Sequence, residues 1–185
     1  MEYAAEYNDA SCRFAAKSGG GGRWLPVRAH LLDTAGIMER LVLRWLSPSA
    51  ARAVFEDPAG IVRLCVFIAM VHDIGKLTPL FEAKILSQLP EIRNDICSRI
   101  VEIPEPGRFM DGRYSPHALA GEAILMHLGC PPGIAAVVGA HHGKPQRDAR
   151  DLKSQMKKFD ANYYGYLEGG ENRALWEEVV FTGKT

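Results

Sequence analysis

The sequence predicts an all-α fold, and three observations support this class. Apolar residues recur at three- and four-residue steps between positions 31 and 45, which is the spacing of one face of a helix. A capping residue followed directly by proline, a common start of a helix, occurs at 57–58, 78–79 and 115–116. No segment shows the regular alternation of apolar and polar residues that is typical of a half-buried strand.

The first two helices are expected on either side of residue 50. The first ends at Ser47-Pro48. The second begins at Asp57-Pro58 and runs to Gly75, and because it is apolar on nearly all sides we expect it to be the central, buried helix. The apolar face of the first helix carries Leu31, Ala35, Met38, Val42 and Trp45.

The later helices are expected from the same start and stop signals. Thr78-Pro79 and Ser115-Pro116 each open a helix, and Gly129 closes the second of these. Pro132 opens another helix, which ends near Gly143. A final helix is expected over 171–181, and loops are expected over 19–22, 102–115 and 144–170.

Length and composition indicate one domain, residues 1–185, in the cytoplasm. The 185 residues are enough to bury a core without a disulfide or a structural metal. Lys plus Arg and Asp plus Glu each number 22, so net charge neither supports nor excludes a nucleic-acid partner. The four cysteines form no CxxC pair, which indicates free thiols in a reducing compartment. The longest apolar run, 61–71, is short and contains Arg63, so no membrane segment is expected.

The histidines form the most informative pattern in the chain. Metal sites built from helices take one or two ligands from each of several helices, because one helix offers only neighbours on one face. Adjacent helical residues point about 100° apart, so each adjacent pair reaches one metal from two sides or serves two metals. Imidazole with carboxylate suits manganese, iron, nickel, cobalt or zinc. The candidate ligands are His30, His72, Asp73, His117, His141 and His142.

Each of these residues also has a structural interpretation. A single histidine such as His30 or His117 is more often a core or surface residue, and His141-His142 could cap a helix end. A buried Asp73 needs a compensating charge, since burying an unpaired carboxylate costs several kcal/mol. Lys76 either neutralises Asp73 or holds a substrate phosphate as a point charge, and we favour the phosphate.

Two further polar residues, Asp33 and His127, lie near members of this pattern. Asp33, near His30, either orients that ring or is a plain surface charge. His127 is expected to have no ligand role, because it lies about 15 Å from His117 along one helix.

The order of these motifs resembles the HD superfamily of metal-dependent phosphohydrolases, which implies an HD-domain helical bundle. The motifs are His30, VHDIGK, SPHALAGE and GAHHGKP. More narrowly, the segment FAAKSGGGGRWLPVRAHLLDTAGIMERL is similar to the amino-terminal HD nuclease domain of the CRISPR-associated helicase-nuclease of type I interference systems. The resemblance extends from about Phe14 to Lys144.

This resemblance implies a metal-dependent nuclease that cuts single-stranded DNA in antiviral defence. It implies two divalent metal ions, which could be manganese, nickel, cobalt, iron or magnesium. A water molecule activated by these ions would attack phosphorus, and Asp73 and Lys76 would be the catalytic residues. The implied partners are single-stranded DNA, the helicase domain of the same system and the RNA-guided surveillance complex. His30, His72 and Asp73 would hold one ion, and the bridging Asp73 with His117, His141 and His142 would hold the other.

The sequence departs from the family pattern at its carboxyl end. A further metal-binding aspartate, expected from a later helix, is not recognisable, and there is no GxxxxGK[ST] phosphate-binding loop. Asp148, Asp151 and Asp160 are the available substitutes. We therefore expect either a truncated HD domain without a helicase or a natural short form, with an apolar patch that promotes self-association. The alternative functions are hydrolysis of a nucleotide or another small phosphate compound, and an inactive docking module.

Overall fold

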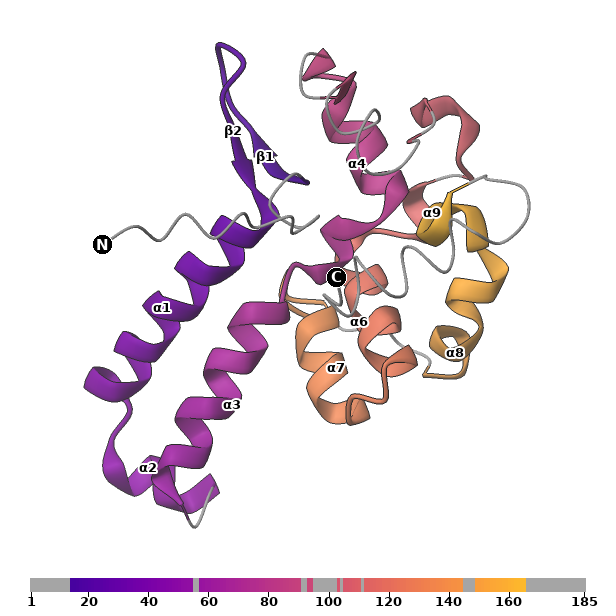
Figure 1. Cartoon of the computed structure of the whole chain (residues 1–185). Helices are drawn as coiled ribbons and strands as arrows, with labels where there is room; N and C mark the ends of the chain where they lie inside the picture. The colour runs from indigo at the N-terminus through magenta and orange to yellow at the C-terminus, as the bar shows by residue number, and fades with distance from the viewer. Residues whose placement is uncertain are drawn as a thin grey trace.

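Helices dominate the computed structural model, which describes residues 14–54, 57–90, 93–94, 103, 105–110, 112–144 and 149–165. This architecture confirms the all-α class (Figure 1). In chain order the α-helices are α1 (Val27–Trp45), α2 (Pro48–Val54), α3 (Pro58–Val71), α4 (Pro79–Leu86), α6 (His117–His127), α7 (Pro132–Gly139), α8 (Ala149–Lys158) and α9 (Asp160–Tyr164). Short 3-10 helices, η2 (Ile74–Leu77), η3 (Pro106–Arg108) and η4 (Gly112–Tyr114), lie between them.

A small antiparallel hairpin precedes the helices and was not expected from the sequence. Strands β1 (Ala15–Ser18) and β2 (Trp24–Pro26) pair around the glycine-rich turn, where Gly21 and Gly22 adopt a φ of 72°. The strands are too short to show an alternating pattern. β2 leads directly into α1, and Figure 1 shows the hairpin projecting beyond the start of that helix.

The helices α1 and α3 pack side by side and are joined by α2 (Figure 1). The expected start of α3 is confirmed, because the Asp57 carboxylate accepts a hydrogen bond of 2.9 Å from the Ala59 amide and Pro58 occupies the first turn. α1 begins at Val27, earlier than its apolar spacing predicts, since Pro26 supplies the extended residue before the helix.

Burial is greatest in η2, α4 and α6 rather than in α3. α3 ends at Val71, and the chain continues through His72 into η2, whose four residues are all buried. Phe67 and Met70 on α3 are 42% and 41% exposed, although the helix is apolar on nearly all sides. Of the segment 57–75, which was expected to be the central, buried helix, only the last part is buried. It shares the central position with α6.

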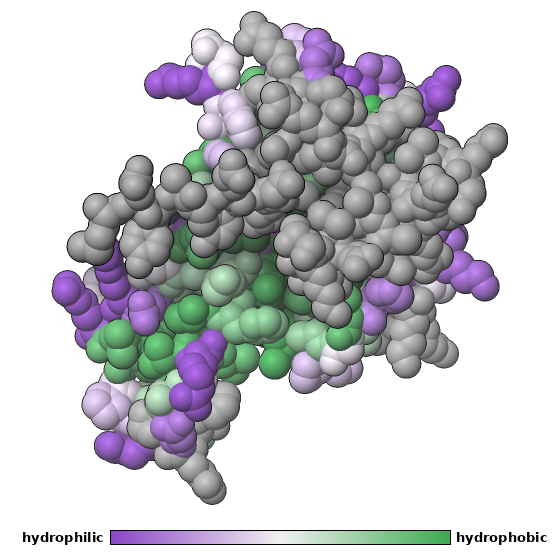
Figure 2. All heavy atoms as spheres, in the orientation of Figure 1, coloured by the Kyte–Doolittle hydropathy of each residue, from purple (hydrophilic) through white to green (hydrophobic). Residues whose placement is uncertain are grey.

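An apolar surface remains exposed on the α1–α3 pair, and Figure 2 shows hydrophobic residues gathered over these helices. The most exposed are Trp45 at 83%, Leu43 at 65% and Ile37 at 58%. We call these exposed side chains together the apolar face, although Leu43 and Ile37 lie on different sides of α1, roughly 120° apart at 3.6 residues per turn. Its residues are Leu32, Ile37, Leu41, Leu43, Trp45, Phe67 and Met70.

The polar stretch 144–170, expected to be a loop, contains two helices. α8 is polar in composition, but Leu152, Gln155 and Met156 recur at helical spacing and are buried, as is Phe159 just after it. α9 follows and buries Asn162, Tyr163 and Tyr164. The high proportion of charged residues concealed this one-sided pattern. The helix expected over 171–181 lies outside the described residues.

Two further expectations concern cysteines and membrane segments. Cys65 and Cys130 are free thiols. In the described part of the chain no single helix has the length and apolar character needed to cross a membrane. The bent pair Ala59–Leu77 and Pro79–Leu86, with a bend of 72°, passes that test only when its two parts are taken together.

Candidate metal centre

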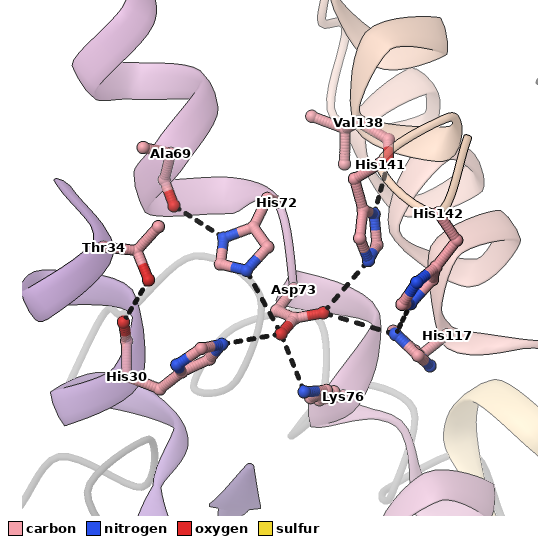
Figure 3. Close-up of polar contacts among 10 residues, drawn as sticks. All are labelled: His30, Thr34, Ala69, His72, Asp73, Lys76, His117, Val138, His141 and His142. Atoms are coloured by element: carbon pink, nitrogen blue, oxygen red, sulfur yellow. Dashed lines mark hydrogen bonds and ion pairs between the residues drawn. The ribbon is translucent and has the colours of Figure 1, made fainter. Parts of the chain in front are cut away.

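The six predicted ligands come from four separate parts of the chain and meet at one place (Figure 3). His30 lies in the first turns of α1, and His117 is the first residue of α6. His72 and Asp73 occupy the junction between α3 and η2. His141 and His142 follow the end of α7 at Gly139. Helix termini thus supply most of these side chains.

Gly75 brings η2 close enough to α6 for Asp73 to reach His117. A Cβ atom at this position would lie 1.9 Å from the His117 carbonyl oxygen and 2.6 Å from the Gly121 amide nitrogen. These are backbone atoms, so only a residue without a side chain permits this approach. The expected role of Gly75 as a helix terminator is therefore replaced by close packing of two backbone segments.

Asp73 is the centre of the site, and each of its two carboxylate oxygens faces imidazole nitrogens. Oδ2 lies 2.9 Å from His30 Nε2, 3.2 Å from His72 Nε2 and 2.7 Å from Lys76 Nζ. Oδ1 lies 3.3 Å from His141 Nε2 and 3.4 Å from His117 Nε2. His117 Nε2 is also 2.8 Å from His142 Nε2. One carboxylate therefore faces two groups of imidazoles.

Backbone carbonyls orient two of the rings. His72 Nδ1 donates to the Ala69 carbonyl at 2.8 Å, and His141 Nδ1 donates to the Val138 carbonyl at 2.7 Å. In a neutral imidazole with its proton on Nδ1, Nε2 carries the lone pair. Both rings therefore present Nε2 toward Asp73, and hydrogen bonds of this kind orient histidine ligands in metal sites.

Burial and hydrogen bonding shift the pKa values of these groups in different directions. Burial alone would raise the pKa of Asp73, but hydrogen bonds from His72 and Lys76 outweigh it and hold that pKa far below its usual range. Burial lowers the pKa of His117 to about 4 and lowers the pKa of His30 and His141. The Asp73 hydrogen bond raises the pKa of His72. Burial thus favours the neutral form of His30, His117 and His141, whereas the hydrogen bond to Asp73 favours the protonated form of His72, which would lose its Nε2 proton on binding a cation.

The geometry of Asp73 and His141 fits a bound cation. Asp73 Oδ1 and His141 Nε2 are buried, 3.3 Å apart, and neither has a hydrogen-bond partner. With the His141 proton on Nδ1, two lone pairs face each other, an arrangement that a positive ion would stabilise. Two sets of ligand atoms each lie within 4.8 Å of one another, His30–His72–Asp73 and His117–His141–His142. We call them the first and second metal groups, and both donor sets suit divalent ions.

The structure brings together the six predicted ligands and places the other candidates outside the two groups. Asp33 is exposed and makes no hydrogen bond to His30 within the described residues. Asp160, the first residue of α9, is also exposed. His127 ends α6, away from His117 at its start. Asp148 and the side chain of Asp151 lie outside what the structure describes.

Lys76 is directed at Asp73 rather than toward solvent. Its Nζ lies 2.7 Å from Asp73 Oδ2, and the residue is 7% exposed. This is the neutralising contact that the sequence offered as the alternative to a phosphate contact. A role for Lys76 in holding a substrate phosphate stays a prediction.

Two buried glutamates near the centre were not predicted. Glu82 is fully buried, and its Oε2 accepts a hydrogen bond of 3.2 Å from the Ala15 amide, while burial raises the pKa of this carboxyl well above its ordinary value. Glu122 fills the space that a Cβ on Gly139 would occupy, and burial raises its pKa as well. A single acid within a mostly apolar helical segment, as in PLFEAKIL and HALAGEAIL, is the signal that could have identified both.

Comparison with known proteins gives one family. A family model described as "Cas3, HD domain" matches residues 15–181. The chain is 32% identical over 154 residues to the "CRISPR-associated nuclease/helicase Cas3" of Streptococcus thermophilus. That match covers 76% of this chain and 16% of the relative, so the chain spans only a small part of the relative's length. No solved structure matches.

Proposed function

Because the chain belongs to the Cas3 HD-domain family, we propose that it is a metal-dependent nuclease that cleaves single-stranded DNA in type I CRISPR interference. One observation carries the proposal. Asp73 faces two groups of imidazoles, and its buried Oδ1 lies against a His141 nitrogen with no hydrogen-bond partner for either atom. Such a centre is suited to two cations that share one carboxylate.

The side chains have distinct tasks in this proposal. His30 and His72 would hold one divalent ion, His117, His141 and His142 would hold the other, and Asp73 would be available to both. When bound, paired divalent ions supply Lewis acidity, which lowers the pKa of water and stabilises charge on a phosphodiester. Lys76 balances the negative charge of Asp73 and is close enough to contribute to stabilising a phosphate.

The exposure of the second metal group favours a polymeric substrate over a small nucleotide. His142 is exposed, whereas His117 and His141 are half-buried, so the centre is open to solvent on the His142 side. An open centre can admit one phosphodiester of a strand whose remaining nucleotides lie outside. By the same family membership, the helicase of the system and the RNA-guided surveillance complex are the proposed partners.

Cleavage of a labelled oligonucleotide tests the proposal. With manganese or nickel, we expect the chain to cut single-stranded DNA, and Asp73→Ala to reduce cutting to background because both ions lose their shared ligand. Glu39→Ala, which removes an exposed carboxylate from α1, is the matched control and should keep full activity.

Other outcomes would assign other functions. Turnover of free nucleotides without cutting would indicate a small-molecule phosphohydrolase. Metal binding with neither activity, also in a chain extended beyond Thr185, would indicate a docking module.

A further inference from the structure

The helices α8 and α9 place two side-chain amides in the interior, beside the segment that leads into α6. Gln155 is the polar member of the buried face of α8, between Leu152 and Met156. Asn162 on α9 is fully buried. A buried amide without partners is destabilising by roughly 1–3 kcal/mol, so these two side chains need specific hydrogen bonds.

Both amides donate to the same hydroxyl. Gln155 Nε2 lies 3.3 Å from Ser115 Oγ, and Asn162 Nδ2 lies 3.1 Å from the same atom. Gln155 also donates to the backbone carbonyl of Tyr114. Ser115 is itself buried, and the fully buried Tyr163 lies against the group, where burial raises its pKa. We call Ser115, Gln155 and Asn162 the amide clamp.

The clamp acts on the start of α6. The sequence predicts Ser115 as a helix cap, but α6 begins at His117, and the N-cap is Pro116, which makes no side-chain cap hydrogen bond. The Ser115 hydroxyl is instead held by α8 and α9. The ring of Pro116 fixes its φ, which is −61° here. Its carbonyl accepts a hydrogen bond of 2.9 Å from the Ala120 amide. Because only this rigid residue separates Ser115 from His117, the position of Ser115 determines where His117 lies.

His117 is sensitive to small displacements. Its Nε2 must meet His142 Nε2, at 2.8 Å, and Asp73 Oδ1, at 3.4 Å, and these partners belong to different elements. A shift of the first turn of α6 would change both distances together. It would disturb the first metal group, His30–His72–Asp73, less, since no member of that group lies on α6 and only Asp73 adjoins η2, which packs on the His117 backbone.

We infer that Gln155 and Asn162 are positioning residues: by holding Ser115 they orient His117, and so set the affinity of the second metal group for a divalent ion without touching that ion. This inference rests on the metal centre of the proposed function. It gives a role to α8 and α9, which contribute no member to either metal group among the described residues.

Gln155→Met tests the inference, because methionine keeps the length of the side chain and removes the amide. Manganese or cobalt binding is measured in two backgrounds: His30→Ala, where binding reports on the second metal group, and His142→Ala, where it reports on the first. We expect Gln155→Met to weaken binding about tenfold in the His30→Ala background, the lower end of the range for partners that orient metal ligands. In the His142→Ala background the affinity should change much less.

Two controls separate positioning from loss of stability. Gln88→Met makes the same chemical change in a surface glutamine that bonds Ser18 Oγ at 3.3 Å, and it should change neither affinity. Met156→Ala truncates a buried neighbour on α8 and leaves the clamp's hydrogen bonds in place. In metal-free protein, amide hydrogen exchange over 117–121 should accelerate in Gln155→Met and not in Gln88→Met.

The results that overturn the inference are specific. It fails if Gln155→Met changes neither affinity, if both backgrounds weaken equally, or if Met156→Ala reproduces the selective loss. These titrations need no DNA. A chain that binds ions with the expected selectivity but cuts nothing would therefore refute the proposed nuclease and still support the clamp.

Discussion

At the scale of single residues, the site depends on how one buried carboxylate is neutralised. Asp73 is 3% exposed and is surrounded by four imidazole nitrogens and the Lys76 ammonium. Breaking a buried, hydrogen-bonded ion pair leaves an uncompensated charge, which is destabilising. Lys76 therefore stabilises the metal-free centre, and it competes with a cation for the same oxygen.

Substitution of Lys76 separates its two candidate roles. We expect Lys76→Met to lower the stability of metal-free protein by about 1–3 kcal/mol, because Oδ2 loses a charged partner, and to tighten metal binding, since a competing cation is gone. Chemical denaturation in the presence of a chelator and a metal titration measure the two effects. Lys84→Met, on α4, is the control. If Lys76→Met changed only the KM for DNA, Lys76 would serve the phosphate instead.

The buried carboxyl of Glu82 makes stability depend on pH. Burial raises its pKa, although the Ala15 amide and the charge of Lys76 oppose this effect. The native state then holds a proton that the unfolded chain has released, so the free energy of unfolding falls as pH rises above the unfolded pKa of about 4.3. Glu82→Gln removes this dependence, so its stability relative to the parent chain should rise progressively as pH increases above about 4.3.

The comparison between variant and parent isolates this one group. The histidines titrate in both proteins, so their contribution cancels in the difference. Denaturant unfolding of metal-free protein at several pH values measures it, with the exposed Glu39→Gln as control. Parallel pH profiles for Glu82→Gln and the parent chain would show that Glu82 is ionised in the native state.

The candidate ligands could be predicted from sequence because they occur in short local motifs. His72-Asp73 and His141-His142 are adjacent pairs, and their polar character stands out against apolar helices. The roles of Glu82 and Gln155 depend on residues far away in the chain, Ala15 and Ser115. No local pattern encodes those distances, so they became visible only in the folded chain.

At the scale of elements, close packing of η2 against α6 joins the two metal groups. The Gly75 backbone approaches α6 so closely that a Cβ would lie 1.9 Å from the His117 carbonyl oxygen. Overpacking of this kind typically costs about 1–3 kcal/mol, and here it would also move Asp73 away from His117. The packing is thus a condition for the geometry of the whole site.

Gly75→Ala is therefore expected to lower stability by about 1–3 kcal/mol and to weaken binding at the second metal group. Gly36→Ala is the matched control, because a Cβ there meets nothing within 4 Å in an exposed part of α1. It should raise stability by about 1 kcal/mol through helix propensity alone. Thermal unfolding and a metal titration test both variants, and equal effects of the two substitutions would contradict the account.

Helix boundaries were predictable where a side chain or a proline marks them. Asp57-Pro58 and Thr78-Pro79 start α3 and α4 as expected. Ser115-Pro116 has the same pattern, but Ser115 is held by α8 and α9, so tertiary contacts replaced the local cap. The hairpin was missed because its strands are only four and three residues long.

At the scale of the whole molecule, the apolar face is the main feature without a partner within the described residues. Its most exposed residues, Ile37, Leu43 and Trp45, lie on α1. Large exposed apolar patches on monomeric proteins promote association. We therefore expect this chain to self-associate through the apolar face.

Light scattering across a range of concentrations measures this association. The double variant Ile37→Lys/Leu43→Lys should remain monomeric at concentrations where the parent chain associates, because burying charges at the contact is unfavourable. Val137→Lys places the same charge on α7, outside the apolar face, and should associate like the parent. A clean monomer of the parent chain at every concentration would count against the prediction.

Anomalous diffraction from crystals grown with manganese would show whether Asp73 joins two groups of ligands around two ions. We expect two peaks about 4 Å apart, one beside His30 and His72 and the other beside His117, His141 and His142, each within bonding distance of Asp73. A single peak, or ions bound elsewhere while Asp73 stays bonded to Lys76, would contradict it.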